Sequence, residues 1–240
     1  MPFSPLKIFV RYLGRGTLVA FLSVAIAGMA LAGSGSAETT PTTGDTIVMG
    51  PITINKINKH VSIKARTAID QGVLEYLLVE DRGKAYESAF KVEASLPSKL
   101  NFSLLLLGIE PLDYNKVLFL ASYEKGRETL LSEHKNSLVA ISLFKDNKEV
   151  GLPRVVRDRE ENAGELLWVF TGSRFTHDGR YAGDISLSHI AIWPDDSAVI
   201  NLFSTRGNPY RGDFGFVMNE KNPSLKKDQE YELVLTPYKQ

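Results

Sequence analysis

The spacing of hydrophobic and polar positions predicts a chain built mostly of short β-strands. Apolar stretches of about five to nine residues, rich in Val, Ile, Leu, Phe and Tyr, are separated by Gly, Asn, Asp and Pro. The pattern shows no regular alternation of strand and helix, which argues against a doubly wound parallel sheet. The expected strands are residues 52–57, 60–67, 73–79, 84–93, 138–144, 154–159, 166–171, 185–192, 198–203, 214–218 and 230–235.

Residues 96–108 predict a helix instead of a strand. Pro97 suits the first helical turn, where no backbone N–H is needed, and Gly108 suits a left-handed cap at the other end. Apolar side chains cover most of the circumference of this helix, which is typical of a buried helix. We therefore expect an α+β fold, mainly an antiparallel β-sheet, with one buried apolar helix near residues 96–108.

Residues 72–92 predict a β-hairpin. Residues 81–83 (Asp-Arg-Gly) fit a three-residue loop with Gly83 in the left-handed position. In that register Glu75 and Glu87 are diagonal neighbours on one face, about 7 Å apart at Cβ. If they are buried, each carboxylate raises the pKa of the other, and the pair could bind a cation or perform acid/base chemistry. On an exposed sheet, both glutamates would simply face water.

The N-terminus has the pattern of a secretory signal peptide. Lys7, Arg11 and Arg15 precede an apolar run at residues 18–32, and small residues follow at 35–37. The run has about 15 residues, whereas a membrane-spanning helix needs about 20, so cleavage is favoured over an uncleaved anchor. We expect contact with the membrane only if the signal stays uncleaved.

The chain is expected to contain one folded domain. Residues 1–37 form the signal peptide, and residues 38–50, rich in Thr, Pro and Gly, form a flexible linker. Residues 51–240 form a single domain, because no second shift in composition and no internal repeat follows. Export places this domain outside the cytoplasm, in the periplasm or the medium.

Composition excludes several classes of function. The 240 residues are 43% hydrophobic and 23% charged, with a net charge of zero and no cysteine. This balance excludes a disordered chain and gives no case for nucleic-acid binding. The missing cysteines exclude disulfides, thiol catalysis and iron–sulfur clusters. We expect no cofactor and no metal site, since the spacing of the four histidines does not place two ligands on one face, and we expect His189 to be a half-exposed structural residue.

Other candidate ligand-binding residues lie on predicted turns and loops. Ser173 follows a strand on a tight turn beside Arg174, and the glycine-containing loop 206–213 carries arginines that could hold a carboxylate or phosphate. The alternative for this loop is a solvated turn. The nucleophile elbow of serine hydrolases is absent. The candidates for ligand binding are Glu75, Glu87, Ser88, Ser173, Arg174, Arg211 and Asp213.

Several blocks of the sequence together resemble the bacterial YdjY domain family. These blocks are GVLEYLLVEDRGKAYES (72–88), LLLLGIEP (104–111), WVFTGSRF (168–175), HIAIWPDDSAVIN (189–201), NPYRGD (208–213) and YELVLTP (231–237). The resemblance implies an exported single-domain protein without an assigned activity, and it brings no catalytic residues. Leu96 departs from the family, which often has Asp before the helix, so the capping side chain is missing or is supplied by Ser95, at a cost of about 1 kcal/mol.

Two functions remain open from the sequence. The first is a non-enzymatic binding or assembly module of the cell envelope, with an unknown protein or small molecule as its ligand. It is favoured because the sequence shows no recognisable set of nucleophile and base. The alternative is a hydrolytic or metal-dependent enzyme that uses the paired carboxylates Glu75 and Glu87. This alternative requires the two side chains to converge with shifted pKa values.

Overall fold

The computed structural model describes residues 44–160, 165–204, 210 and 215–239, all within one compact unit. The helices are α1 (Pro97–Leu106), α2 (Tyr114–Ser122), α3 (Gly126–Glu133) and α4 (Ala182–Ser186), with short 3₁₀ helices η1 (Ala85–Glu87), η2 (Lys135–Ser137) and η3 (Leu152–Arg154). The strands are β1 (Thr46–Met49), β2 (Ile52–Asn55), β3 (His60–Thr67), β4 (Val73–Leu74), β5 (Tyr76–Glu80), β6 (Ser88–Val92), β7 (Leu138–Lys145), β8 (Lys148–Val150), β9 (Val156–Asp158), β10 (Trp168–Phe170), β11 (Ser188–Ala191), β12 (Ile200–Leu202), β13 (Phe216–Met218) and β14 (Glu230–Pro237).

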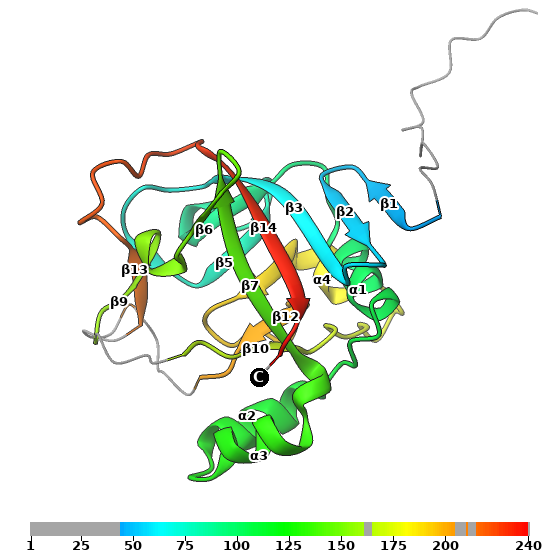
Figure 1. Cartoon of the computed structure of the whole chain (residues 1–240). Coiled ribbons are helices and arrows are strands. Elements are labelled where there is room, and N and C mark those ends of the chain that lie inside the picture. The colour runs from blue at the N-terminus through cyan, green and yellow to red at the C-terminus, as the bar shows by residue number, and fades with distance from the viewer. Residues whose placement is uncertain (1–43, 161–164, 205–209, 211–214, 240) are drawn as a thin grey trace, which may run out of the picture. The chain divides into compact units, whose positions relative to one another are not determined.

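Eight strands close into a barrel (Figure 1). Their order around the barrel is β3, β14, β7, β10, β12, β11, β5 and β6. Neighbours are antiparallel except for two parallel pairs, β11 with β12 and β5 with β6. The barrel closes where β6 pairs with β3 through Arg66 opposite Lys91 and Thr67 opposite Phe90. We call this short pairing the seam.

The remaining strands lie outside the closed barrel. Strands β1 and β2 form a hairpin that pairs with β3, and β8 pairs with β7. Strands β4, β13 and β9 form a separate small sheet. Because β14 occupies one edge of β3, strands β2 and β6 share the other edge, β2 along residues 60–63 and β6 along residues 66–67. The edge of β3 thus changes partner near Lys64.

Side chains from the strands fill the barrel. Ile63, Leu78, Phe90, Phe170 and Leu233 are fully buried in one hydrophobic cluster. Alternate residues of each strand point inward, and eight strands enclose a space just wide enough for these side chains. The interior therefore holds no helix.

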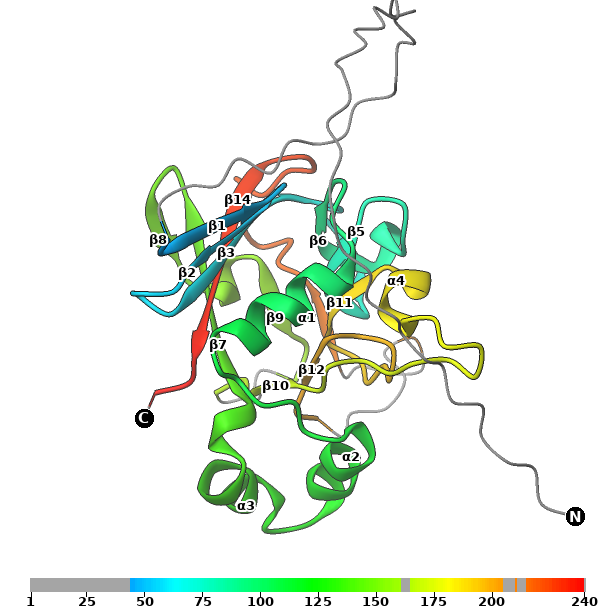
Figure 2. The same cartoon turned by 90° about the vertical axis from the view of Figure 1, so that its right-hand side faces the viewer.

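The predicted α+β fold with a buried helix near residues 96–108 is wrong. Helix α1 does form, and Gly108 has the expected left-handed φ of 81°. Helix α1 contacts β2, β11 and α4 and packs Leu100 and Leu104 against the core (Figure 2). Its opposite face leaves Phe102 and Leu105 about half exposed, at 48% and 47%. The apolar circumference suggested burial on all sides, but the strand side chains already occupy the barrel interior.

The predicted hairpin at residues 72–92 is also wrong. Strands β5 and β6 are parallel, with Leu78 opposite Phe90, and residues 81–87 return the chain to the start of β5. Gly83 is not left-handed. A Cβ at Gly83 would lie 3.0 Å from the Cβ of Leu187, so the glycine permits close packing against the segment before β11 rather than a hairpin turn.

Each expected strand overlaps an observed one, while several elements were not expected. Strand β1 lies inside residues 38–50, which were predicted to be a linker, and β8 and helices α2 to α4 are additional. Among the described residues, no helix has the length and apolar character needed to cross a membrane.

Candidate functional site

Glu75 and Glu87 come together at the start of the parallel β5–β6 pair. Glu75 lies between β4 and β5, Glu87 ends η1, and the Glu75 N–H donates to the Glu87 carbonyl at 2.9 Å. Both residues are buried, at 7% and 6% exposure. Lys84 Nζ lies 3.5 Å from Glu75 Oε2 and 3.3 Å from Glu87 Oε1. Two buried carboxylates therefore share one ammonium group.

The surroundings shift the protonation of this pair. Burial raises the pKa of Glu75, and the negative charge of Glu87 and a hydrogen bond to it raise it further, against the opposing effect of Lys84. Burial lowers the pKa of Lys84, but its interactions with Tyr76 and Glu87 outweigh burial and raise it. Lys84 stays positive while Glu75 retains its proton to a higher pH than an ordinary glutamate.

Two tyrosines complete the cluster. The Lys84 ammonium lies 5.1 Å from the centroid of the Tyr76 ring, a cation–π distance. Burial and the negative charge of Asp195 raise the pKa of Tyr76 to about 12, and its hydroxyl donates to Asp195 Oδ2 at 3.0 Å. The Tyr210 hydroxyl donates to Glu87 Oε2 at 3.0 Å, and burial followed by its contact with Glu87 raises the pKa of Tyr210.

This arrangement can move a proton or hold a cation. A carboxyl with a raised pKa beside a carboxylate stabilised by Lys84 and Tyr210 is the pattern of an acid paired with a charged partner. A metal ion would have to compete with the Lys84 ammonium for the same oxygens. Within the described residues, no group of three His, Asp or Glu side chains is arranged to hold a metal ion.

The other predicted site residues do not join this cluster. Ser88 is buried and donates to the Phe90 carbonyl at 2.7 Å, which is a structural contact. Ser173 follows Gly172, whose carbonyl accepts a hydrogen bond from Tyr181 at 2.8 Å. Arg174 forms an ion pair with Asp196 at 2.6 Å rather than with either glutamate. Arg211 and Asp213 lie outside the described residues.

His189 is fully buried, so the expectation of a half-exposed histidine is wrong. Its ring makes no hydrogen bond of normal geometry in the described part of the chain. Burial lowers its pKa to about 3, although nearby backbone groups of Leu187 and Ser95 act in the opposite direction. Strand β11 pairs with β5 and β12 along its two edges, and all four of its residues are buried, so both of its faces are covered. His189 is therefore a neutral core residue at physiological pH.

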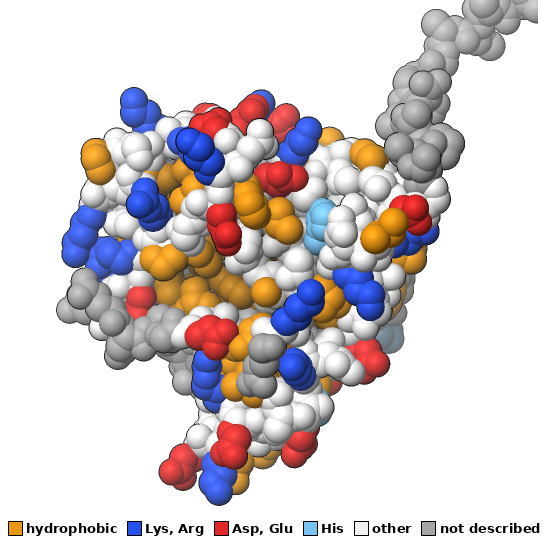
Figure 3. Space-filling model, viewed as in Figure 1, with side chains coloured by type: hydrophobic (Ala, Val, Ile, Leu, Met, Phe, Trp, Pro, Cys, Tyr) orange, Lys and Arg blue, Asp and Glu red, His pale blue; other side chains and the backbone are white. Residues whose placement is uncertain are grey.

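A groove of about 620 Å³ lies beside the seam. The basic residues that line it are Lys64, Arg66 and Lys91, the acidic residues are Glu93, Asp146, Glu230 and Glu232, and the rest are Pro51, Ala65, Ala94, Phe144, Asn147 and Tyr231. Side chains of both charges are interspersed over this part of the surface, where Figure 1 places β3 and β14 (Figure 3). The groove has the volume of a typical small-molecule site.

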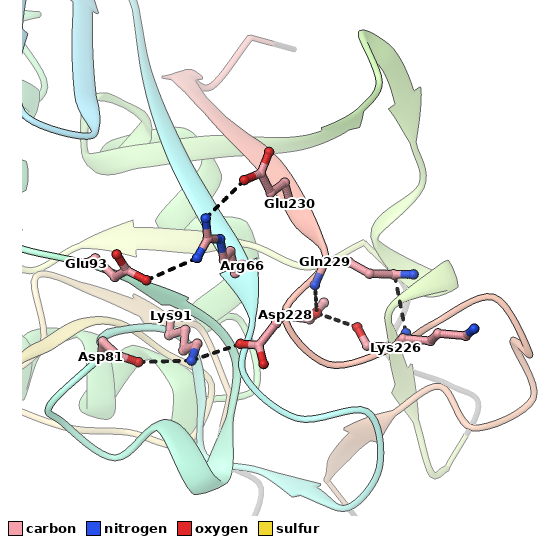
Figure 4. Close-up of polar contacts among 9 residues, drawn as sticks. Arg66, Asp81, Lys91, Glu93, Lys226, Asp228, Gln229 and Glu230 are labelled. Carbon is pink, nitrogen blue, oxygen red and sulfur yellow. Dashed lines mark hydrogen bonds and ion pairs between the residues drawn. The ribbon is translucent and has the colours of Figure 1, made fainter.

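Ion pairs fix one side of the groove (Figure 4). Arg66 bridges Glu93 at 3.3 Å and Glu230 at 3.1 Å, which links β3 to the end of β6 and to β14. Lys91 bridges two aspartates, Asp81 at 3.1 Å and Asp228 at 3.0 Å. These ion pairs stabilise the seam, and the charges of Arg66 and Lys91 are both paired with acidic residues.

The other charges of the groove have no such partners. Lys64, Glu232 and Asp146 form no ion pair with any residue that the structure describes. Lys64 and Glu232 nevertheless stand opposite each other in the β3–β14 register, and Glu232 stands opposite Phe144 in the β14–β7 register. A cation, an anion and an aromatic ring therefore form one row across three neighbouring strands.

Several residues of these sites were not predicted from the sequence. Lys84 was detectable, since it precedes Glu87 by three residues, a spacing that allows an ion pair across a helical turn. Asp195 and Tyr210 carried no signal, because they reach the cluster from more than a hundred residues away in the chain. The groove was not detectable either, since β3, β14 and β7 are far apart in sequence.

Comparisons with family models, curated proteins and solved structures found no match for this chain. The resemblance to the YdjY domain family therefore stays a prediction that rests on the sequence blocks alone.

Proposed function

We propose that this protein is an exported, non-enzymatic binding module of the cell envelope and that the groove beside the seam is its binding site. The observation that carries this proposal is that Lys64 and Glu232, which form no ion pair with a described residue, lie in one row in a groove of about 620 Å³. A concave surface with a few unpaired polar groups and an aromatic wall is the usual form of a small-molecule site. The N-terminal charge and hydrophobicity pattern supports export.

The binding site can be tested by NMR titration of the purified protein. The probes are one representative each of the amino acids, sugars, dicarboxylates and polyamines, with the ring signals of Phe144 and Tyr231 as reporters. Saturable shifts at both rings with at least one probe are expected. If no probe shifts either ring at 10 mM or so, the groove is not a small-molecule site.

Export can be tested separately by cell fractionation and N-terminal sequencing. The expected product lies outside the cytoplasm and begins near Glu38, with the basic and apolar segments removed. A protein that stays in the cytoplasm with an intact N-terminus would contradict the export proposal and leave the groove proposal unaffected.

The second candidate function is acid/base hydrolysis by Glu75 and Glu87. The raised pKa of Glu75 favours it, because a carboxyl that keeps its proton can act as a general acid. The Lys84 ammonium argues against it, since that group already occupies the oxygens that a substrate would need. We therefore place this candidate second.

A hydrolase screen decides between the two candidates. The probes are p-nitrophenyl esters and glycosides, and the variants are Glu75→Gln and Glu87→Gln, with Glu149→Gln on the exposed strand β8 as a matched control. The binding module predicts no turnover above the uncatalysed rate. Turnover that both site variants abolish and the control retains would establish the enzyme instead.

A further inference from the structure

We infer that the groove beside the seam binds a free α-amino acid with an apolar side chain. This inference rests on the proposed function and names its ligand. It follows from the order of the side chains across the groove, which is Lys64 on β3, Glu232 on β14 and Phe144 on β7. The ligand carboxylate contacts Lys64, its ammonium contacts Glu232, and its side chain packs on Phe144.

The spacing of this row matches the geometry of such a ligand. Residues that face each other in an antiparallel pair have Cβ atoms about 5 Å apart, and adjacent strands lie about 4.8 Å apart. The carboxylate, ammonium and side chain of an α-amino acid all branch from one carbon atom. The three ligand groups can therefore reach the three residues in the order in which the strands present them.

The charges of the row select for a zwitterion. Lys64 and Glu232 lack ion-pair partners among the described residues, although their strand positions face each other. A dicarboxylate would satisfy Lys64 but be repelled by Glu232 and by Asp146, which also lines the groove. A polyamine would be repelled by Lys64, the basic lining residue that forms no ion pair with a described residue. A ligand with one charge of each sign avoids both repulsions.

The apolar lining accounts for the side chain of the ligand. Phe144 is half-buried, and Pro51 and Ala65 also line the groove. The Tyr231 ring is buried and lies 5.3 Å from the Lys145 ammonium, and Lys145 is not among the residues that line the groove. An apolar or aromatic side chain would bury part of its surface against Phe144.

The test is isothermal titration of the purified protein with L-phenylalanine and three analogues. Phenylalaninol lacks the carboxylate, N-acetyl-L-phenylalanine lacks the ammonium, and glycine lacks the side chain. L-Phenylalanine is expected to bind, and each analogue is expected to bind at least tenfold more weakly. Binding of phenylalaninol or N-acetyl-L-phenylalanine as tight as that of L-phenylalanine would overturn the inference.

Variants of the row provide the second arm of the test. Lys64→Met, Glu232→Gln and Phe144→Ala are each expected to weaken binding of L-phenylalanine at least fivefold. The matched controls Lys56→Met and Glu133→Gln change exposed charges outside the groove, on residues that do not pair with the row, and are expected to have no effect. Equal affinity of the row variants and the controls would overturn the inference.

The outcome also separates this inference from the proposed function. If L-phenylalanine does not bind but another probe class shifts the groove signals in the NMR titration, the ligand assignment is wrong and the binding module stands. If no probe shifts these signals, both are wrong.

Discussion

Replacing Lys84 by methionine tests whether one ammonium group neutralises two buried carboxylates. The variant keeps the length and much of the apolar stem of the side chain but removes its charge from both glutamates. Breaking a fully buried ion pair costs about 3–5 kcal/mol, whereas an exposed pair contributes about 0–1 kcal/mol. The Lys84 side chain is 46% exposed and those of Glu75 and Glu87 are 10% and 9% exposed, so we expect an intermediate loss of about 2 kcal/mol at pH 8.

The loss is expected to depend on pH. The pKa of Glu75 is already raised, and removing Lys84 raises it further, because the charge of Glu87 is then uncompensated. Because the pKa of Glu75 is higher in the folded than in the unfolded protein, its protonation stabilises the folded state fully below pH 4.5, the pKa of the unfolded protein. This stabilisation disappears as the pH rises through the pKa of the folded protein. The variant should therefore lose less stability at pH 5 than at pH 8, because Glu75 takes up a proton.

Urea unfolding followed by tryptophan fluorescence measures this difference, since Trp168 is buried and reports on the core. Lys64→Met is the matched control, because Lys64 is exposed and forms no ion pair with a described residue; it should change stability by less than about 0.5 kcal/mol at both pH values. An equal loss at pH 5 and pH 8, or a loss no larger than that of the control, would refute the shared-ammonium arrangement.

Three further predictions concern the scaffold. Asp184→Ala removes the carboxylate that accepts the Ser98 N–H at 2.8 Å and caps α1 from α4, so urea unfolding should show a loss of about 1 kcal/mol. The pKa of His189 is lowered to about 3, so the contribution of this group to the stability of the fold is complete above about pH 6.5 and is lost as the pH falls below that value. The wild-type free energy of unfolding should decrease by about 2 kcal/mol from this group by pH 5, and His189→Leu should remove this pH dependence. Lys91→Met leaves two aspartates unpaired beside the seam, and hydrogen exchange should accelerate more at Ala68, whose N–H donates to the Ala89 carbonyl across the seam, than in β14.

The strand positions could be predicted from sequence because period-two alternation is a local property. His60–Thr67 and Glu230–Pro237, for example, alternate between buried and more exposed residues along their length. Their pairing is not local, and the order β3–β14–β7 could not be derived from the pattern. The closure of the sheet into a barrel follows from that order, and the position of α1 follows from the closure.

The sequence pointed to the pair Glu75 and Glu87, but through a predicted hairpin that does not form. The hairpin placed Glu75 and Glu87 on one face, and the parallel pairing brings the same two residues together through the Glu75 N–H and the Glu87 carbonyl. Gly83 fits both arrangements locally, because a glycine tolerates a left-handed turn as well as close packing. Only Leu187, more than a hundred residues later, decides between them.

The N-terminal cap of α1 also depends on a residue that is distant in the sequence. Leu96 offers no capping side chain, and the sequence suggested that the cap was missing or moved to Ser95. The cap comes from Asp184, on a helix that the sequence did not predict. Contacts between distant segments thus supply what local patterns lack.

The closed barrel creates both the groove and the carboxylate pair, so the proposals above depend on it. Backbone NOEs in the isotope-labelled protein test it most directly. NOEs are expected between Thr67 and Phe90 across the seam, and between Leu78 and Phe90 in the parallel pair. NOEs that join Leu78 to Tyr86, together with none between β3 and β6, would show an open sheet with a hairpin and contradict it.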